Sequence, residues 1–128
     1  MFYQITQYLK FLFKSTNQHG VHSPFVYDLI TQCFYDKTPY HSYQTISEYR
    51  KALIINKTKI KITDLGSGSH KNNSKYRIIS EMAKHAGSTF PGAKLIHRLV
   101  KYFKSDTILE LGTYLGIATQ AMHLANPK

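Results

Sequence analysis

Apolar side chains recur every three or four positions along much of this chain, which is the spacing of an amphipathic helix. The pattern predicts helices over residues 2–16, 24–36, 42–56, 75–85 and 90–104. Ser23 and Pro24 supply an N-cap and the residue preferred at the first helical position. The first helix has so much apolar surface that we expect it to pack on its own domain or on a second copy, with a membrane surface as the alternative.

Two shorter stretches have the pattern of β-strands. Residues 59–64 alternate between polar and apolar, as a strand with one solvated face does. Residues 107–111 are apolar on both faces, which is typical of the central strand of a doubly wound sheet, and a helix-compatible segment follows at 117–125. The short loops show no linker, so the sequence predicts one α/β domain over 1–128, rich in helices and with two short strands.

Each predicted strand leads into a loop that contains glycine. Asp64-Leu-Gly-Ser-Gly-Ser69 follows a strand with lysines on one face and continues into polar residues. Glu110-Leu-Gly-Thr-Tyr-Leu-Gly116 follows the strand that is apolar on both faces and continues directly into a helix. Neither is a Walker loop, because no Gly-Lys-Ser/Thr follows at the required spacing. We therefore predict that the second loop approaches a ligand with its backbone.

Composition adds a strongly basic charge. The chain has 17 Lys and Arg against 7 Asp and Glu, for a formal net charge of +10. This balance favours polyanions, although the basic residues are spread along the whole chain. The ten tyrosines either occupy half-buried helix positions or, with the lysines, form a stacking platform for RNA or DNA. A nucleic-acid-binding or oligomerisation module is therefore the alternative function.

Few residues suggest metal or redox chemistry. His19 and His22 lie three apart in a turn, but no cysteine or acid accompanies them, so we predict no metal site. Cys33 lies in an apolar helical pattern and is expected to be a buried structural thiol. A single cysteine, no signal-peptide pattern and no apolar run long enough to span a bilayer predict a cytoplasmic protein without a transmembrane segment.

The segment from Glu110 to Ala118, with the helix before it, resembles the first motif of class I S-adenosylmethionine-dependent methyltransferases. It is most similar to the small-molecule O-methyltransferase branch. The stretches His19–Phe25 and Asp64–Ser69 are similar to uncharacterised bacterial members of the same superfamily.

The resemblance implies the helix-rich N-terminal part of a Rossmann-like fold, in which residues 1–58 form a helical segment and residues 59–128 begin the core. It also implies S-adenosylmethionine as cofactor. In this family the two glycines of the loop let backbone amides approach the amino-acid end of the cofactor, and the acid helps to hold it. The cofactor-binding residues so implied are Glu110, Gly112, Thr113, Tyr114 and Gly116.

The chain departs from the family pattern after the loop. Only 12 residues follow Gly116, whereas the ribose-binding acid of Rossmann-like domains lies about 20 residues beyond the glycine loop. We therefore expect a truncated methyltransferase that alone neither binds the cofactor tightly nor transfers methyl groups. A central strand without neighbours exposes unpaired edges, so we expect 107–111 to pair with 59–64 or with a second copy, giving a homo-oligomer. No motif identifies a catalytic residue or a methyl acceptor.

Overall fold

The computed structural model describes residues 2–15, 17–62, 76–85 and 87–126. Its internal contacts divide the chain into two compact units, Met1–Asp36 and Lys37–Lys128. The prediction of a single domain stays a prediction. We expected a helical segment to end at residue 58 and a core to begin at residue 59, whereas the internal contacts divide the chain after Asp36.

The first unit consists of helical elements joined by short loops. These elements are α1 (Phe2–Lys14), η1 (Gln18–Gly20), α2 (Pro24–Asp28) and η2 (Leu29–Phe34), of which η1 is a 3₁₀-helix and η2 a π-helix. The Ser23 hydroxyl accepts a hydrogen bond from the backbone N–H of Val26 at 3.4 Å, and Pro24 follows it, so the predicted N-cap is confirmed. Cys33 is buried, as expected.

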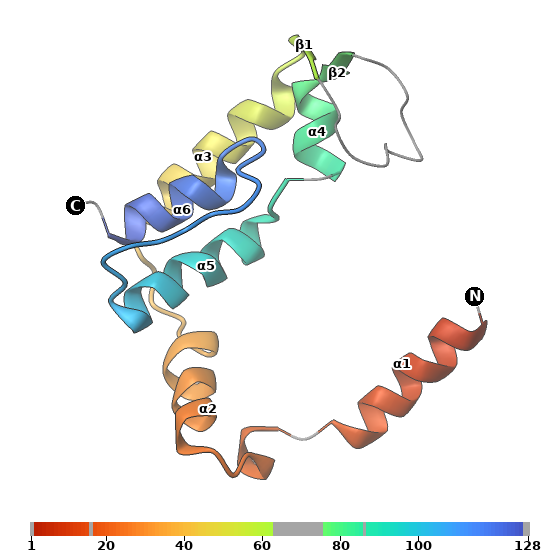
Figure 1. The fold of residues 1–128 in the computed structure, drawn as a ribbon, viewed down its shortest axis with the longest axis vertical. Coiled ribbons are helices and arrows are strands. Elements are labelled where there is room, and N and C mark those ends of the chain that lie inside the picture. The colour runs from red at the N-terminus through yellow and green to blue at the C-terminus, as the bar shows by residue number, and fades with distance from the viewer. Residues whose placement is uncertain (1, 16, 63–75, 86, 127–128) are drawn as a thin grey trace. The chain divides into compact units, whose positions relative to one another are not determined.

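Three helices that pack on one another form the body of the second unit (Figure 1). They are α3 (Ser42–Ile55), α5 (Phe90–Phe103) and α6 (Ile117–Ala125). A further helix, α4 (Ile79–His85), packs on α3. The two strands, β1 (Lys59–Lys61) and β2 (Tyr76–Ile78), pair antiparallel, with Lys59 opposite Ile78.

A small apolar cluster joins the three packed helices. Ile46 of α3, Ala93 of α5, and Ile117 and Ala121 of α6 are at most 2% exposed and form one cluster. The two alanines let the helix backbones approach closely, and Ile46 fills the space between them. Partly buried side chains surround the cluster: Tyr43, Tyr49, Leu53, Phe90, Ile96 and Leu124.

Sequence and structure agree on the bounds of α5. Thr89 is its N-cap, and the Thr89 hydroxyl accepts a hydrogen bond from the backbone N–H of Gly92 at 3.2 Å. Pro91 lies in the first turn, where its missing N–H costs no hydrogen bond. The helix ends at Phe103, and its C-cap residue, Lys104, adopts the left-handed conformation with a φ of 49°. The predicted helix over 90–104 is therefore confirmed.

The strand predictions are correct only in part. Residues 107–111 form a loop and no strand, and the only described strands, β1 and β2, pair with each other and not with them. The expected pairing of 107–111 with 59–64 is therefore wrong within the described chain. The strand predicted for 59–64 is assigned only over Lys59–Lys61, and its last two residues lie outside the described part.

The helix predicted for 75–85 begins later than expected. Tyr76–Ile78 is β2, and the helix starts at Ile79. In β2 the backbone forms its hydrogen bonds with β1 and not within a helix, although the spacing of the apolar side chains favours a helix. The prediction of a helix-rich α/β chain holds, while the described strands form an antiparallel pair and no Rossmann-like sheet. None of the described helices is long and apolar enough to cross a bilayer.

Candidate functional site

The loop between α5 and α6 contains all five residues predicted to bind the cofactor. After α5 ends, this loop returns beside α6 to the end of the unit at which α5 begins, and α6 starts there (Figure 1). Helices α5 and α6 therefore run in the same general direction. The start of α6 consequently lies beside residues 87 and 88, which precede α5. The glycine loop and the beginnings of two helices thus meet at one end of the unit.

Three residues of this loop have left-handed backbone conformations. Gly112 has a φ of 88° and Gly116 a φ of 72°, which glycine adopts without steric cost. Tyr114, with a φ of 55°, is one of two described non-glycine residues with a positive φ. The backbone N–H of Gly116 donates to the carbonyl oxygen of Thr113 at 2.9 Å, closing a turn. The glycine spacing seen in the sequence therefore serves a tight turn into α6.

Side chains of α3 hold the loop in place. The Tyr49 hydroxyl donates a hydrogen bond to the carbonyl oxygen of Leu115 at 2.9 Å, in a partly buried position. The neighbouring Arg50 donates through Nε to the carbonyl oxygen of Ser88 at 3.3 Å. Sequence reasoning missed both residues, because each reaches a backbone carbonyl far along the chain and no local pattern marks such a contact.

Glu110 joins the residues before the loop to the first turn of α6. Its Oε2 accepts a hydrogen bond of 2.5 Å from the Thr119 hydroxyl. The carboxylate is thereby placed near the N-terminal end of α6, where the helix dipole favours negative charge. The predicted acid and the loop glycines therefore belong to one local arrangement.

A small pocket opens at the loop. Its volume is about 80 Å³, and its lining residues are Gly87, Ser88, Glu110, Gly112, Thr113, Tyr114, Leu115, Ile117 and Ala118. Four of the five predicted residues line it, whereas Gly116 forms the N-cap of α6 instead. Ligand pockets usually measure roughly 300–1,000 Å³, so this pocket is too small to enclose a whole nucleotide-sized ligand.

A larger pocket of about 240 Å³ lies along α6. Glu110 lines this pocket as well as the smaller one, so this residue borders both. Thr119 and His123 are also part of its lining.

The predicted strand before the loop has one open side. Leu109 and Leu111 are 83% and 87% exposed. Ile108 is only 40% exposed, and Glu110 is half-buried. Side chains two apart therefore share a side, and the leucines lie on the outer one. Within segment 107–111, the described residues therefore cover the side of Ile108 and Glu110 in part and leave the side of the two leucines exposed.

His97, which had no predicted role, is an internal anchor. It is 1% exposed, and its Nε2 shares a hydrogen bond of 2.7 Å with the Ser42 hydroxyl. The rings of Tyr40 and Tyr43 lie 5.1 Å and 5.3 Å from its ring, measured between centroids. His97 therefore fastens the start of α3 to the middle of α5.

The other candidate residues are not brought together. His19 lies exposed in η1, and His22 lies exposed just after it. The described part of the chain contains no group of three His, Cys, Asp or Glu placed to hold a metal ion. The Asp64–Ser69 loop lies outside the described residues.

Two lysines of α5 lie over aromatic rings of the chain itself. Lys94 Nζ is 4.8 Å from the ring centroid of Tyr43 and 5.3 Å from that of Phe90. Lys101 Nζ is 5.3 Å from the ring centroid of Tyr40. These lysines cover ring faces that a base-stacking platform would need. Nucleic-acid binding stays a prediction, which a steep fall of affinity with rising salt would support.

Comparison of the chain with protein-family models, with curated proteins and with solved structures found no match. Any assignment of function to this chain therefore depends on the residues and geometry of its own loop.

Proposed function

We propose that residues 107–119 form the first cofactor-binding loop of an S-adenosylmethionine-dependent methyltransferase, and that the chain represents the N-terminal portion of such an enzyme. One observation carries the proposal: Gly112 and Gly116, both left-handed, lead into the start of α6 beside the carboxylate of Glu110. This geometry presents backbone N–H groups and an acid at the same place, as a zwitterionic amino-acid group requires.

The residues present fit the amino-acid end of this cofactor. Backbone N–H groups of the loop and of the first turn of α6 complement its carboxylate, and Glu110 complements its ammonium. Thr113 and Tyr114 line the same pocket. When bound, the cofactor supplies an electrophilic methyl group, and these residues of the chain contribute binding and orientation.

The course of the chain supports the same proposal. Two helices that run in one direction, joined by a segment that passes back between their ends, are the arrangement of an α-β-α unit in a doubly wound fold. Leu109 and Leu111, in the segment that passes back, are exposed apolar side chains. We propose that the described residues form one end of the cofactor site, bind the cofactor weakly and transfer no methyl group alone.

Calorimetry tests the weak-binding part of this proposal. Titration of the 128-residue chain with S-adenosylmethionine is expected to give no saturable heat at micromolar concentrations, because the pocket is far smaller than the cofactor. Binding in the micromolar range would contradict an incomplete site. Changes in the loop's backbone amide NMR signals at millimolar cofactor test whether the loop is the binding site.

We further propose that the chain forms a homo-oligomer. Residues 107–111 have no strand partner among the described residues, and two of their leucines are open to solvent. Exposed apolar side chains of this kind are removed from water when a second copy covers them. Light scattering at tens of micromolar protein is expected to give a mass above that of the 14.8 kDa chain. A monomeric mass would count against this.

A further inference from the structure

Helix α1 has an apolar side whose side chains are exposed. At 3.6 residues per turn, its six most closely grouped apolar residues fall within an arc of roughly 140°. These residues are Phe2, Ile5, Tyr8, Leu9, Leu12 and Phe13. All of them are between 47% and 90% exposed, and the helix buries no residue. An apolar arc of this width is typical of a helix that lies on a surface.

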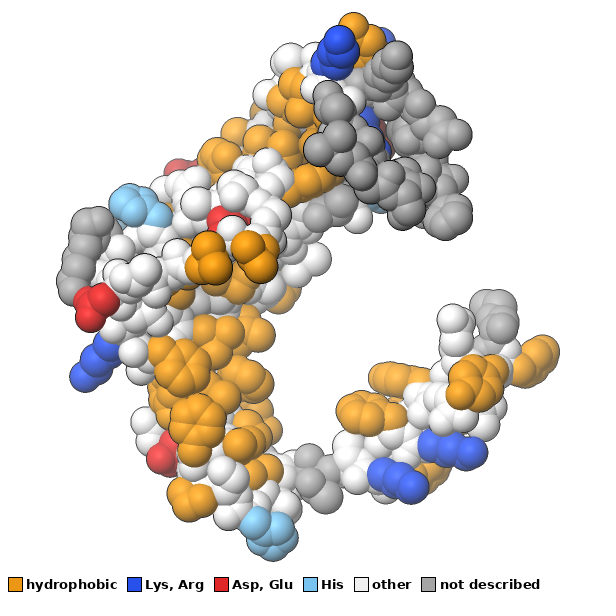
Figure 2. Space-filling model, viewed as in Figure 1, with side chains coloured by type: hydrophobic (Ala, Val, Ile, Leu, Met, Phe, Trp, Pro, Cys, Tyr) orange, Lys and Arg blue, Asp and Glu red, His pale blue; other side chains and the backbone are white. Residues whose placement is uncertain are grey.

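The opposite side of α1 carries the two lysines of the helix, together with the exposed rings of Tyr3 and Phe11. By helical spacing Lys10 and Lys14 project away from the apolar arc. Figure 2 shows basic side chains (blue) along one side of this helix, with most of its hydrophobic side chains on the other. The first acidic residue of the chain is Asp28, well beyond the helix. The helix therefore has only positive charge, and its partner must tolerate or attract that charge.

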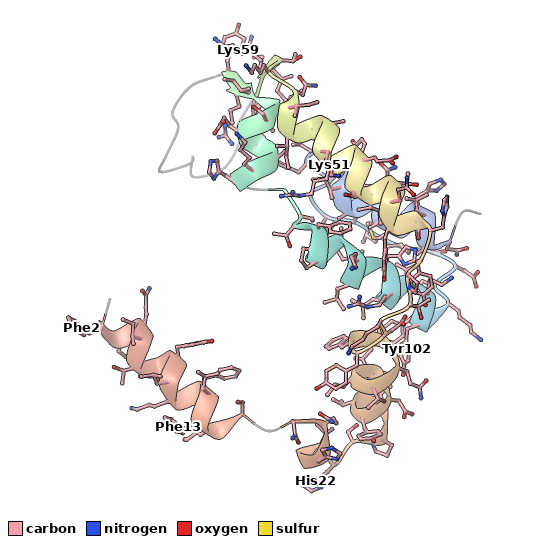
Figure 3. The ribbon with its side chains drawn as sticks, turned by 180° about the vertical axis from the view of Figure 1, so that it is seen from behind. Phe2, Phe13, His22, Lys51, Lys59 and Tyr102 are labelled. Atoms are coloured by element: carbon pink, nitrogen blue, oxygen red, sulfur yellow. The ribbon has the colours of Figure 1, made fainter. Side chains whose placement is uncertain are left out.

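The length of α1 restricts how it can meet a membrane. Its 13 residues span about 20 Å, which is shorter than a hydrocarbon core of about 30 Å. The helix can therefore lie in the plane of the interface but cannot cross it. Phe2 and Phe13, at its two ends in Figure 3, are 89% and 90% exposed. Both belong to the apolar arc.

We propose that α1 binds the surface of membranes that contain anionic lipids. A second copy of α1 fits less well, because that helix has no acidic side chain that could neutralise Lys10 and Lys14. An anionic bilayer complements both sides at once: the acyl chains accept the aromatic and aliphatic arc, and the headgroups attract Lys10 and Lys14. Lipid binding by α1 does not depend on the glycine loop.

Sedimentation of the full chain with vesicles tests this proposal. Binding is expected to vesicles of phosphatidylcholine with about one third phosphatidylglycerol and to be much weaker with phosphatidylcholine alone. The double variant Lys10→Gln/Lys14→Gln is expected to bind the anionic vesicles roughly 30-fold less tightly, or about fivefold for each lysine. Equal binding to both vesicle types, or none to either, would overturn the proposal.

Two phenylalanines provide a matched pair of variants. Phe13 lies within the apolar arc and Phe11 lies outside it, and both side chains are exposed, at 90% and 63%. Phe13→Gln is expected to reduce vesicle binding by at least about tenfold, because it removes a buried ring from the interface. Phe11→Gln is expected to leave binding within about twofold of the parent chain, because its ring lies outside the buried arc. An equal loss in both variants would contradict binding through the arc. An oligomer that Phe13→Gln dissociates, without any vesicle binding, would overturn the proposal in favour of a second copy.

Discussion

The backbone conformation of Gly116 gives a quantitative test of how the loop is held. With a φ of 72°, this residue is left-handed and is the N-cap of α6. An alanine pays roughly 1–2 kcal/mol to adopt that conformation. The reduced freedom of the unfolded chain offsets about 0.4–1 kcal/mol of this. We therefore expect Gly116→Ala to lower the free energy of unfolding by about 1 kcal/mol.

The surroundings of Gly116 prevent the strain from relaxing. A Cβ atom there would lie 3.5 Å from the Tyr49 hydroxyl, an ordinary contact, so the cost is conformational and not steric. The next residue, Ile117, is 2% exposed and packs in the core, so a change of φ at Gly116 would turn α6 out of its place. For a unit of this size about 1 kcal/mol corresponds to a fall in Tm of about 4–8 °C.

Gly112 provides the control, because it has a similar φ of 88° but a Cβ atom there would meet no other atom within 4 Å. Gly112 is exposed and its loop is unpaired, so the backbone can readjust. We expect Gly112→Ala to lower Tm by less than half as much. Gly116→Asn should cost less than Gly116→Ala, because asparagine adopts left-handed conformations more readily. Thermal unfolding followed by circular dichroism measures all three. If Gly112→Ala lowers Tm as much as Gly116→Ala does, the position of Gly116 next to the buried Ile117 does not determine the loss of stability.

Three further substitutions test the contacts that position the loop and the helices. Tyr49→Phe removes the hydrogen bond to the Leu115 carbonyl and is expected to cost about 1 kcal/mol in urea denaturation; no loss would show that the tether is dispensable. Ile46→Ala opens a cavity at a side chain that is 0% exposed, with an expected cost of about 2–5 kcal/mol in the same assay, and a cost below about 1 kcal/mol would contradict its place in the core. Ser42→Ala takes from the buried His97 Nε2 its hydroxyl partner, for an expected loss of about 1–3 kcal/mol, which an unchanged denaturation midpoint would contradict.

The helices could be predicted from the sequence because their signals are local. Thr89 and Pro91 mark the start of α5, and the apolar spacing that follows continues to Phe103. The same holds for Ser23 and Pro24 at the start of α2. A cap and a periodic stripe depend on residues within a few positions of one another, so they keep their meaning without knowledge of the rest of the fold.

The strands and the loop's supports could not be predicted in this way. Tyr76–Ile78 has the apolar spacing of a helix, yet it pairs with β1. Residues 107–111 have the apolar pattern of a central strand, yet they have no partner strand among the described residues. Whether such segments form strands depends on neighbours far along the chain. The hydroxyl of Tyr49 likewise meets a carbonyl 66 residues away.

A titration of the isotope-labelled chain with S-adenosylmethionine, followed through its backbone amide NMR signals, is the decisive experiment for the glycine loop. We predict millimolar affinity, with shifts concentrated at Gly112, Thr113 and Tyr114 and at the first turn of α6. We also predict weaker binding by Glu110→Gln, since the carboxylate that complements the cofactor's ammonium is lost. Shifts that avoid the loop at millimolar cofactor, or a Glu110→Gln chain that binds as well as the parent, would contradict the assignment of this loop to the cofactor.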